Sequence, residues 1–442
     1  MIMEKRITTI VGAGAILDFD LPEGMPKPST KYITDEVVKM DVKGFKDDNP
    51  ITIIKDIYDI LRQAKYPVPV NFEHLFHALE MCYAYGWVWK DPANPPKNPN
   101  VFPVFAPLTL PSHDFDLDDV RPAMHDFLLK VMDIVNGYNA PYLADESFNK
   151  WYRDFWRCYQ GAWDVFNLNY DTTIEHSLDH CEDGFEDIQG QPEFQHFNPK
   201  KLWKNENGWS TMCHVHGCIE FHDGRYKESV YKDEVLKYDF HDLYKYPTYD
   251  IVRDHYMGSS KSWMANQAGE QLENTPIITG LRKNDKLNIV PFDFYHGYLY
   301  KCIMDSNALL IAGYSFGDLY VNQIIERMEL IHENSKRVVL IDWWLLHVSD
   351  EVINGVTDPD DRQELIKDMM VQRVADDDFN HRMGYFLCRM TGETSTYEAA
   401  ASFKNFSRTA PMISKNGCLM LFIGGFKAAS EYREEIFGFL NS

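Results

Sequence analysis

Three short stretches of this 442-residue chain combine polar side chains that could act on a ligand. The first is Asn169-Tyr170-Asp171, in which an amide and a carboxylate stand two residues apart after an apolar run. Such a pair can orient a sugar hydroxyl and a ligand amide. Because Asn and Asp also form turns by bonding their own backbone, the pair alone fits a simple turn at least as well.

The second stretch, Cys213–Cys218, contains two histidines. Strand alternation would put His214, His216 and Cys218 on one face. His and Cys bind zinc, but structural zinc sites draw on a second, distant pair of ligands, and the eight cysteines include no C-x-x-C pair. We therefore expect no metal here. We expect instead that His216, just before a glycine, is a general base and that the other histidine is packed away.

The third stretch is Gly313–Asp318, which lies between an apolar run and a predicted helix at 319–332. Such a turn presents amides and a hydroxyl at a helix N-terminus, where they suit phosphate or ribose. The alternative is a conformational glycine turn in which Asp318 caps the helix. The letters GYSFG also fit the nucleophile elbow of serine hydrolases. The histidines downstream of Ser315 are too few to favour that class.

A fourth stretch, Gly12-Ala13-Gly14-Ala15, follows a predicted strand at 7–12. Its glycines let the backbone approach a pyrophosphate closely. A dehydrogenase fingerprint would also need Gly or Ala at position 17, where Leu17 stands, and prolines follow instead of a crossover helix. The alternative is a turn that needs glycine for its conformation alone.

The elements that must position these stretches are predicted as short apolar strands separated by helices. This pattern is typical of a parallel α/β sheet, whose functional groups gather at the carboxyl ends of the strands. The predicted strands span residues 7–12, 163–171, 211–221, 275–281, 307–318 and 336–344.

A helical insertion, about 35–160, separates the first predicted strand from the second. Apolar spacing predicts helices there, the first of them beginning at Thr34 as its N-cap. A loop with seven prolines is expected at 92–111. The tail, 346–442, is expected to add helix and one late strand.

Charge and composition limit the classes of function. Lys and Arg number 44 against 67 Asp and Glu, so the net charge of −23 opposes direct binding of nucleic acid. No apolar run approaches the roughly 18–20 residues that cross a bilayer. The N-terminus lacks a signal-like core, so we expect a cytoplasmic protein with reduced cysteines.

The order of the four stretches resembles the sirtuin family, in particular the sirtuin-like proteins of bacterial anti-phage defence. The resemblance covers roughly residues 6–345. It implies an α/β fold with a Rossmann-like parallel sheet of the sirtuin type and a large helical insertion. Residues 1–345 would form the NAD-binding and hydrolysing domain, and 346–442 an α/β C-terminal extension that serves interaction or oligomerisation.

The resemblance also implies roles for single residues. Asn169 would orient the nicotinamide ribose and a water, Asp171 would hold the nicotinamide carboxamide, and His216 would act on the ribose hydroxyls. The NAD diphosphate would lie over the first glycine turn, which consists of Gly12, Ala13, Gly14 and Ala15.

Four further positions follow from the same resemblance. Gly313 and Ser315 would lie on the adenosine side, and Asp342 would meet the adenine ribose. Thr30 is the candidate ligand contact in the segment that replaces a deacetylase motif of the family.

Departures from the family pattern point to the reaction. Ile16 stands where a serine usually follows the glycine turn, and the four-cysteine zinc module is missing. In deacetylases that module supports the groove for the acetyl-lysine peptide. We therefore expect no zinc, no cofactor beyond NAD as substrate, and an NAD glycohydrolase (NAD+ nucleosidase) that releases nicotinamide and ADP-ribose. The alternatives are an NAD-dependent protein deacylase and a non-catalytic module that senses NAD or ADP-ribose.

Such an activity would be toxic unless it were restrained. The resemblance therefore implies an effector of abortive infection that is controlled by assembly, either as a homo-oligomer or by a partner protein. A HerA-type hexameric ATPase and a short Argonaute are the familiar partners of sirtuin-like defence proteins.

Overall fold

The computed structural model of the chain describes twelve stretches of the sequence. They are residues 6–43, 50–63, 70–90, 117–223, 242–258, 263–265, 271–273, 275–280, 283–344, 350–375, 381–403 and 405–442. The proline-rich loop predicted at 92–111 lies outside the described residues.

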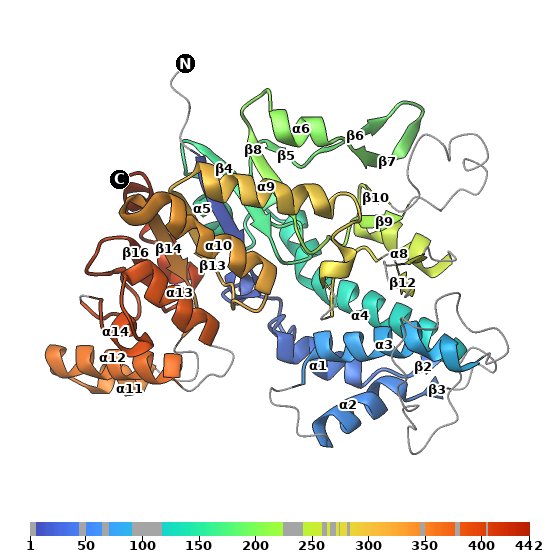
Figure 1. The fold of residues 1–442 in the computed structure, drawn as a ribbon, viewed down its shortest axis with the longest axis horizontal. Coiled ribbons are helices and arrows are strands. Elements are labelled where there is room, and N and C mark those ends of the chain that lie inside the picture. Colours follow the sequence, from blue (N-terminus) through green and yellow to red (C-terminus); the bar gives the residue numbers. More distant parts are fainter. Residues whose placement is uncertain are drawn as a thin grey trace.

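An eight-stranded sheet forms the centre of the fold, in the order β15-β16-β14-β13-β1-β4-β8-β5 (Figure 1). All of its neighbouring strands are parallel except β15 and β16. The predicted Rossmann-like α/β fold is therefore confirmed. The strands are β1 (Arg6–Val11), β4 (Ala162–Asn167), β5 (Cys181–Glu182), β8 (Ser210–His214), β13 (Ala308–Ala312), β14 (Arg337–Ile341), β15 (Met412–Ile413) and β16 (Leu419–Phe422).

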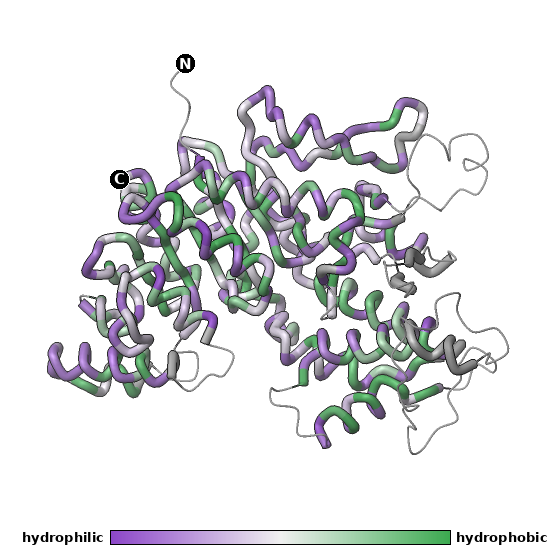
Figure 2. Tube along the Cα trace, viewed as in Figure 1, coloured by the Kyte–Doolittle hydropathy of each residue, from purple (hydrophilic) through white to green (hydrophobic). Residues whose placement is uncertain are grey.

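Helices cover the central strands and bury their residues. Every residue of β4 and of β13 is buried, as expected for parallel strands that are covered on both faces. Helix α9 (Phe292–Asp305) packs against β4 and β8, and α16 (Arg433–Leu440) packs against β13 and β14. Figure 2 shows hydrophobic residues concentrated along these strands and hydrophilic ones around α6 (Pro199–Lys204).

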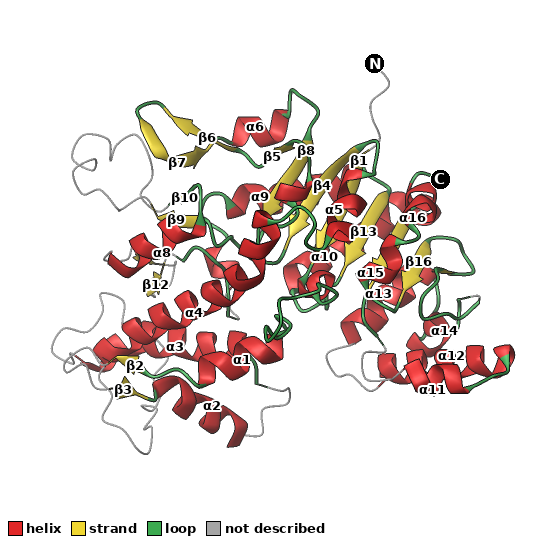
Figure 3. Cartoon of the chain, turned by 180° about the vertical axis from the view of Figure 1, so that it is seen from behind, coloured by secondary structure: helices red, strands yellow, loops and turns green. Residues whose placement is uncertain are grey.

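The insertion forms a helical block, defined here as α1 (Thr30–Val38), α2 (Ile53–Gln63), α3 (Phe72–Lys90) and α4 (Leu117–Ala144). The strands β2 (Val42–Lys43) and β3 (Pro50–Ile51) pair beside it. Seen from behind, the block lies apart from the helices of the tail, residues 346–442 (Figure 3).

The start of the first helix differs from the prediction. Ser29, not Thr34, is the N-cap of α1, and its hydroxyl accepts a hydrogen bond from the Tyr32 amide. The Thr34 hydroxyl instead donates to the Thr30 carbonyl and accepts from the Phe72 amide at the start of α3. Thr34 therefore joins two helices of the block.

Two predicted strands were wrong. The chain leaves the sheet at His214, and Gly217 takes a left-handed φ of 91°, so β8 does not continue to residue 221. Residues 275–280 form no strand of the parallel sheet. They run beside the turn after β8, with one antiparallel bridge between Gly217 and Ile277.

A small antiparallel sheet that the sequence did not suggest lies beside β5. Its order is β6 (Phe185–Ile188), β7 (Gln191–Phe197), β10 (Leu243–Lys245) and β9 (Phe221–Asp223). Helix α5 (Lys150–Arg157) precedes β4, and helix α8 (Tyr249–Gly258) packs on β9. Two further strands, β11 (Trp263–Ala265) and β12 (Gln271–Glu273), pair antiparallel with each other.

The tail contributes to the main sheet. Its helices α11 (Asp350–Gly355), α12 (Pro359–Ala375), α13 (His381–Thr391) and α14 (Thr396–Ala400) precede β15 and β16. The ring of Phe426, in α15 (Phe426–Ser430), packs against the ring of Phe155 in α5, with the ring centroids 4.7 Å apart. The predicted late strand is thus confirmed as β16, and the division at residue 345 stays a prediction.

Within the described stretches, we find no helix whose length and apolar character would let it cross a membrane.

The adjacent strands β1 and β13 end in two glycine turns that touch backbone to backbone. The Gly14 amide donates to the Gly313 carbonyl at 2.9 Å. Gly313 has a left-handed φ of 63°, and a Cβ added there would lie 2.0 Å from the Ala15 nitrogen. Close packing of the two turns therefore requires glycine at 313, whether or not a ligand binds.

We predict that Gly313→Ala destabilises the protein by about 3 kcal/mol or more, because it adds both backbone strain and a clash with main-chain atoms. Gly438→Ala is the matched control, since Gly438 lies in α16 with open space around it. Alanine there should raise stability by up to about 1 kcal/mol. Urea unfolding measures both changes, and equal stabilities for the two variants would contradict this account of the turn.

Candidate functional site

The predicted site residues on the sheet all follow the carboxyl ends of parallel strands. Gly12–Ala15 follow β1, Asn169 and Asp171 follow β4, and His216 follows β8. Gly313 and Ser315 follow β13, and Asp342 follows β14. Because parallel strands end at a common edge, the topology brings these stretches together there.

Asn169 connects two of the stretches directly. Its side-chain amide donates to the Gly12 carbonyl at 3.2 Å, so the loop after β4 is tied to the first glycine turn. Its backbone amide donates to the Asn167 side-chain oxygen at 3.0 Å. The remaining amide oxygen of Asn169 is the atom with which this side chain can accept from a ligand or water.

Asn167 is a positioning residue that sequence reasoning missed. It is fully buried, and its side-chain amide donates to the Asp171 carbonyl at 3.1 Å. Its own carbonyl accepts from the Val215 amide at 3.1 Å. Asn167 thus fixes the loop of Asn169 and joins it to the turn of His216. The polar spacing Asn167, Asn169, Asp171 was the signal that could have shown it.

Asp171 faces the helical block. It is fully buried; one carboxylate oxygen accepts from the amide and hydroxyl of Thr173, and the other accepts from the Tyr138 hydroxyl at 3.2 Å. Burial raises the pKa of Asp171, against the effect of these hydrogen bonds. These contacts stabilise the loop, and the predicted contact with a nicotinamide carboxamide stays a prediction.

His216 is paired with a carboxylate from across the sheet edge. Its Nε2 lies 2.8 Å from an Asp318 oxygen, and the two side chains are only 7% and 8% exposed. Although burial acts to raise the pKa of Asp318, the hydrogen bond and charge of His216 hold that pKa well below its usual value. A buried carboxylate in this position fixes the orientation of the imidazole ring.

Asp318 also begins a helix. Its other oxygen accepts from the amides of Tyr320 and Val321, at 2.9 and 3.1 Å, at the start of α10 (Leu319–His332). The capping role considered from the sequence is therefore confirmed. The pairing with His216 was missed, because no spacing along the chain relates two residues 102 positions apart.

The two histidines of the second stretch occupy different environments. His214 is fully buried, with Nε2 2.9 Å from a Glu175 oxygen, and Lys245 lies 2.6 Å from the other oxygen of that carboxylate. The expectation that one histidine is packed away is confirmed. The expectation that both share a strand face is wrong, because β8 ends at His214.

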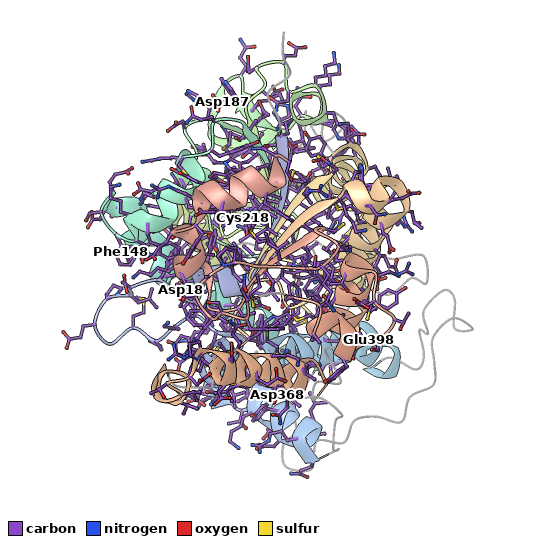
Figure 4. All side chains as sticks on the ribbon, turned by 90° about the vertical axis from the view of Figure 1, so that its left-hand side faces the viewer. Asp18, Phe148, Asp187, Cys218, Asp368 and Glu398 are labelled. Atoms are coloured by element: carbon purple, nitrogen blue, oxygen red, sulfur yellow. The ribbon has the colours of Figure 1, made fainter. Side chains whose placement is uncertain are left out.

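The surroundings of this turn are interior. Figure 4 places Cys218, which is fully buried, toward the middle of the molecule, between Asp187 near one end and Asp368 near the other. Across the described stretches, no group of three or more His, Cys, Asp or Glu side chains is arranged to hold a metal ion.

A third histidine lies close to the pair. His296, on α9, is buried, and its ring packs against the Tyr320 ring with the ring centroids 5.0 Å apart. Burial, with His216 nearby, lowers the pKa of His296 to about 4, so the ring is neutral near pH 7. Sequence reasoning missed it because a histidine inside an aromatic helix carries no motif.

The first glycine turn offers less to a phosphate than the motif suggested. The amides of Gly12, Gly14 and Ala15 all donate to main-chain carbonyls. Ala13 is exposed and begins the 3-10 helix η1 (Ala13–Ile16). Among the described hydrogen bonds, its amide is the one in this turn that is left for a ligand.

The other predicted positions lie further out. Ser315 is exposed in the turn after β13. The Asp342 carboxylate accepts from the Trp343 amide and the Trp344 indole, at 2.7 and 3.2 Å. Thr30 is exposed at the first residue of α1. Their roles toward adenosine and NAD stay predictions.

The protein thus has a Rossmann-like α/β fold, and the His216–Asp318 pair lies at the carboxyl ends of its central strands. A family model described as a SIR2-like domain matches residues 164–372. The match supports a sirtuin-like protein with an NAD-related activity. It includes the segments of Asn169, His216 and Asp318, and it excludes the first glycine turn. A comparison with curated proteins gives no match.

We predict that Asp318→Asn lowers the free energy of unfolding by about 2 kcal/mol at pH 6, because it removes a buried charged hydrogen bond but keeps a capping side chain. The pKa of Asp318 is depressed in the folded protein, so its stabilising effect is present above about pH 4 and is lost as pH falls. The difference between wild type and variant should therefore shrink from pH 5 to pH 3.

Urea unfolding at several pH values measures this difference. Asp305→Asn is the matched control, since Asp305 pairs with Lys301 on an exposed helix surface. Its effect should stay within about 0.5 kcal/mol. A difference for Asp318→Asn that does not change with pH would contradict the charged pair.

Proposed function

We propose that this protein is an NAD glycohydrolase that cleaves NAD to nicotinamide and ADP-ribose. The observation that carries the proposal is the buried pair of His216 and Asp318 at the same sheet edge as Asn169 and the glycine turns. The SIR2-like match over these segments supports an NAD-related activity.

The proposed reaction breaks the bond between ribose C1′ and the nicotinamide nitrogen. The bonding electrons go to the cationic ring, which leaves as neutral nicotinamide, and C1′ acquires oxocarbenium character. A water oxygen then bonds to C1′ and its proton goes to His216. Asp318 stabilises the imidazolium as it forms, and it holds the ring in one orientation.

Asn169 supplies orientation in this scheme. Because its amide nitrogen is bound to the Gly12 carbonyl, its oxygen has a fixed direction and can accept from the attacking water or from a ribose hydroxyl. Fixing a water beside the reacting carbon turns a bimolecular step into an effectively unimolecular one.

We further propose that the protein acts as a toxic effector in anti-phage defence and is controlled by assembly. The finer family resemblance supports this role, together with a homo-oligomer or a partner such as a HerA-type ATPase or a short Argonaute. Leu330 and Ile331, exposed at 74% and 54% near the end of α10, offer an apolar contact for such an assembly.

If these side chains carry a self-contact, Leu330→Asp should shift the protein to a smaller species. Light scattering coupled to size-exclusion chromatography measures the mass, and Glu326→Asp on the same helix serves as control. An unchanged oligomer in Leu330→Asp would contradict a contact at this end of α10.

The activity itself is tested by nicotinamide release from NAD. We predict that Asn169→Ala and His216→Ala each reduce the rate at least 100-fold, since a positioned base alone contributes about 10²–10⁴-fold. The matched controls are Asn441→Ala and His180→Ala, which replace the same residue types at exposed positions and should leave the rate unchanged.

Other outcomes favour the alternative functions. Turnover that requires an acylated peptide would indicate a deacylase. Tight NAD binding with no nicotinamide release, by the protein alone or assembled, would indicate a sensor. Equal rates in wild type and in the two site variants would contradict the assignment of Asn169 and His216.

A further inference from the structure

Two ion pairs connect the helical block to the segment that follows residues 275–280. Glu73 lies 2.9 Å from Lys283, and Glu80 lies 2.5 Å from Lys286. The glutamates are seven residues apart, on one face of α3. The lysines are three residues apart in the 3-10 helix η4 (Lys283–Lys286), where positions i and i+3 eclipse. The two ion pairs therefore join one face of α3 to one face of η4.

The pair of Glu80 and Lys286 is deeply buried, with side chains only 4% and 1% exposed. Burying two charges costs solvation that their attraction barely recovers, so such a pair adds little to stability compared with apolar residues. It does restrict geometry, because a shift of either helix would leave a buried charge without its counter-ion. The pair therefore defines the register of α3 against η4.

Residues 275–280, which precede η4 in the chain, pack against the turn that contains His216. The Ile278 amide donates to the His216 carbonyl at 2.7 Å, and the Cys218 amide donates to the Pro276 carbonyl at 3.2 Å. A Cβ added to Gly217 would lie 2.2 Å from the Pro276 oxygen. The segment therefore lies directly against the main chain of the proposed base.

The same short segment also touches the ion pair. Gly280 has a left-handed φ of 83°, and a Cβ added there would lie 2.9 Å from a Glu80 oxygen. Gly280, which packs closely against Glu80, is thus only two residues along the chain from Ile278, which bonds to His216.

The block holds the other half of the site through a different helix. On α4, the Tyr138 hydroxyl donates to Asp171 and the Asn139 side chain exchanges hydrogen bonds with Thr172 at 3.0 and 3.1 Å. The loop of Asn169 is therefore held by α4, and the turn of His216 by α3.

Lys283 adds an electrostatic connection. Burial acts to lower the pKa of Lys283. The negative charge of Glu73, followed in strength by Tyr170 and Asp318, outweighs burial and raises this pKa above its usual value. Lys283 is therefore charged, and it lies in the electric field of the carboxylate that pairs with His216.

We propose that Glu80–Lys286 and Glu73–Lys283 are positioning residues, through which the helical block sets the place of His216 relative to Asn169. Movement of the block, for example on assembly, would then change the geometry of the site. The effect on catalysis rests on the proposed NAD cleavage, whereas the mechanical coupling does not.

The test replaces the buried pair as a unit. Glu80→Leu combined with Lys286→Met removes both charges at similar volume, so the fold should persist. We expect faster amide exchange in peptides covering 214–219 and 275–280, with unchanged exchange in β13 and β14. In NAD cleavage we expect kcat to fall at least 10-fold with KM changed less than 2-fold.

Two further variants keep the test decisive. Glu73→Gln breaks the more exposed pair and should give smaller changes of the same kind, so it replaces the double variant if that one unfolds. Lys55→Met removes an exposed ion pair with Asp59 within α2 of the same block, and it should leave both readouts unchanged.

The outcomes separate the two proposals. Unchanged exchange at 214–219 would overturn the coupling, and faster exchange with an unchanged kcat would overturn the role of the ion pairs in positioning His216 for catalysis. If wild type releases no nicotinamide but the double variant shows faster exchange at 214–219 and 275–280, the coupling stands and the proposed reaction fails.

Discussion

The hydrogen bond between His216 and Asp318 is the interaction on which the site depends. His216 follows β8 and Asp318 follows β13, with β1 and β4 lying between those strands. The bond therefore spans the carboxyl edge of the sheet, above the turn that begins at Gly12. It also joins the proposed base to the first residues of α10, because Asp318 caps that helix. One carboxylate thus serves both the fold and the proposed chemistry.

The place of the candidate site in the fold was largely predictable from the sequence, because most of its residues come shortly after the ends of strands. The apolar runs before Gly12, Asn169 and Gly313 are buried, and in a parallel sheet the ends of such strands must meet. The helix predicted at 319–332 appears as α10 with the same bounds. Local pattern and tertiary arrangement agree at these positions.

The rest depended on contacts between distant segments. His296 and Asp318 reach His216 from different helices, and residues 275–280, although apolar like a strand, pair with a turn instead of the sheet. The glycines at 12 and 313 also proved to serve the packing of two turns, which leaves Ala13 as the amide available to a phosphate. No spacing along the chain encodes these arrangements.

The central claim is that water attacks ribose C1′ with His216 as base, and hydrolysis of NAD in ¹⁸O-labelled water tests it most directly. The account predicts ADP-ribose that carries one ¹⁸O at C1′, formed by wild type together with an equal amount of nicotinamide, and no such product from His216→Ala. Unlabelled or cyclic ADP-ribose would contradict attack by water. Labelled product from His216→Ala at the wild-type rate would contradict the role of His216.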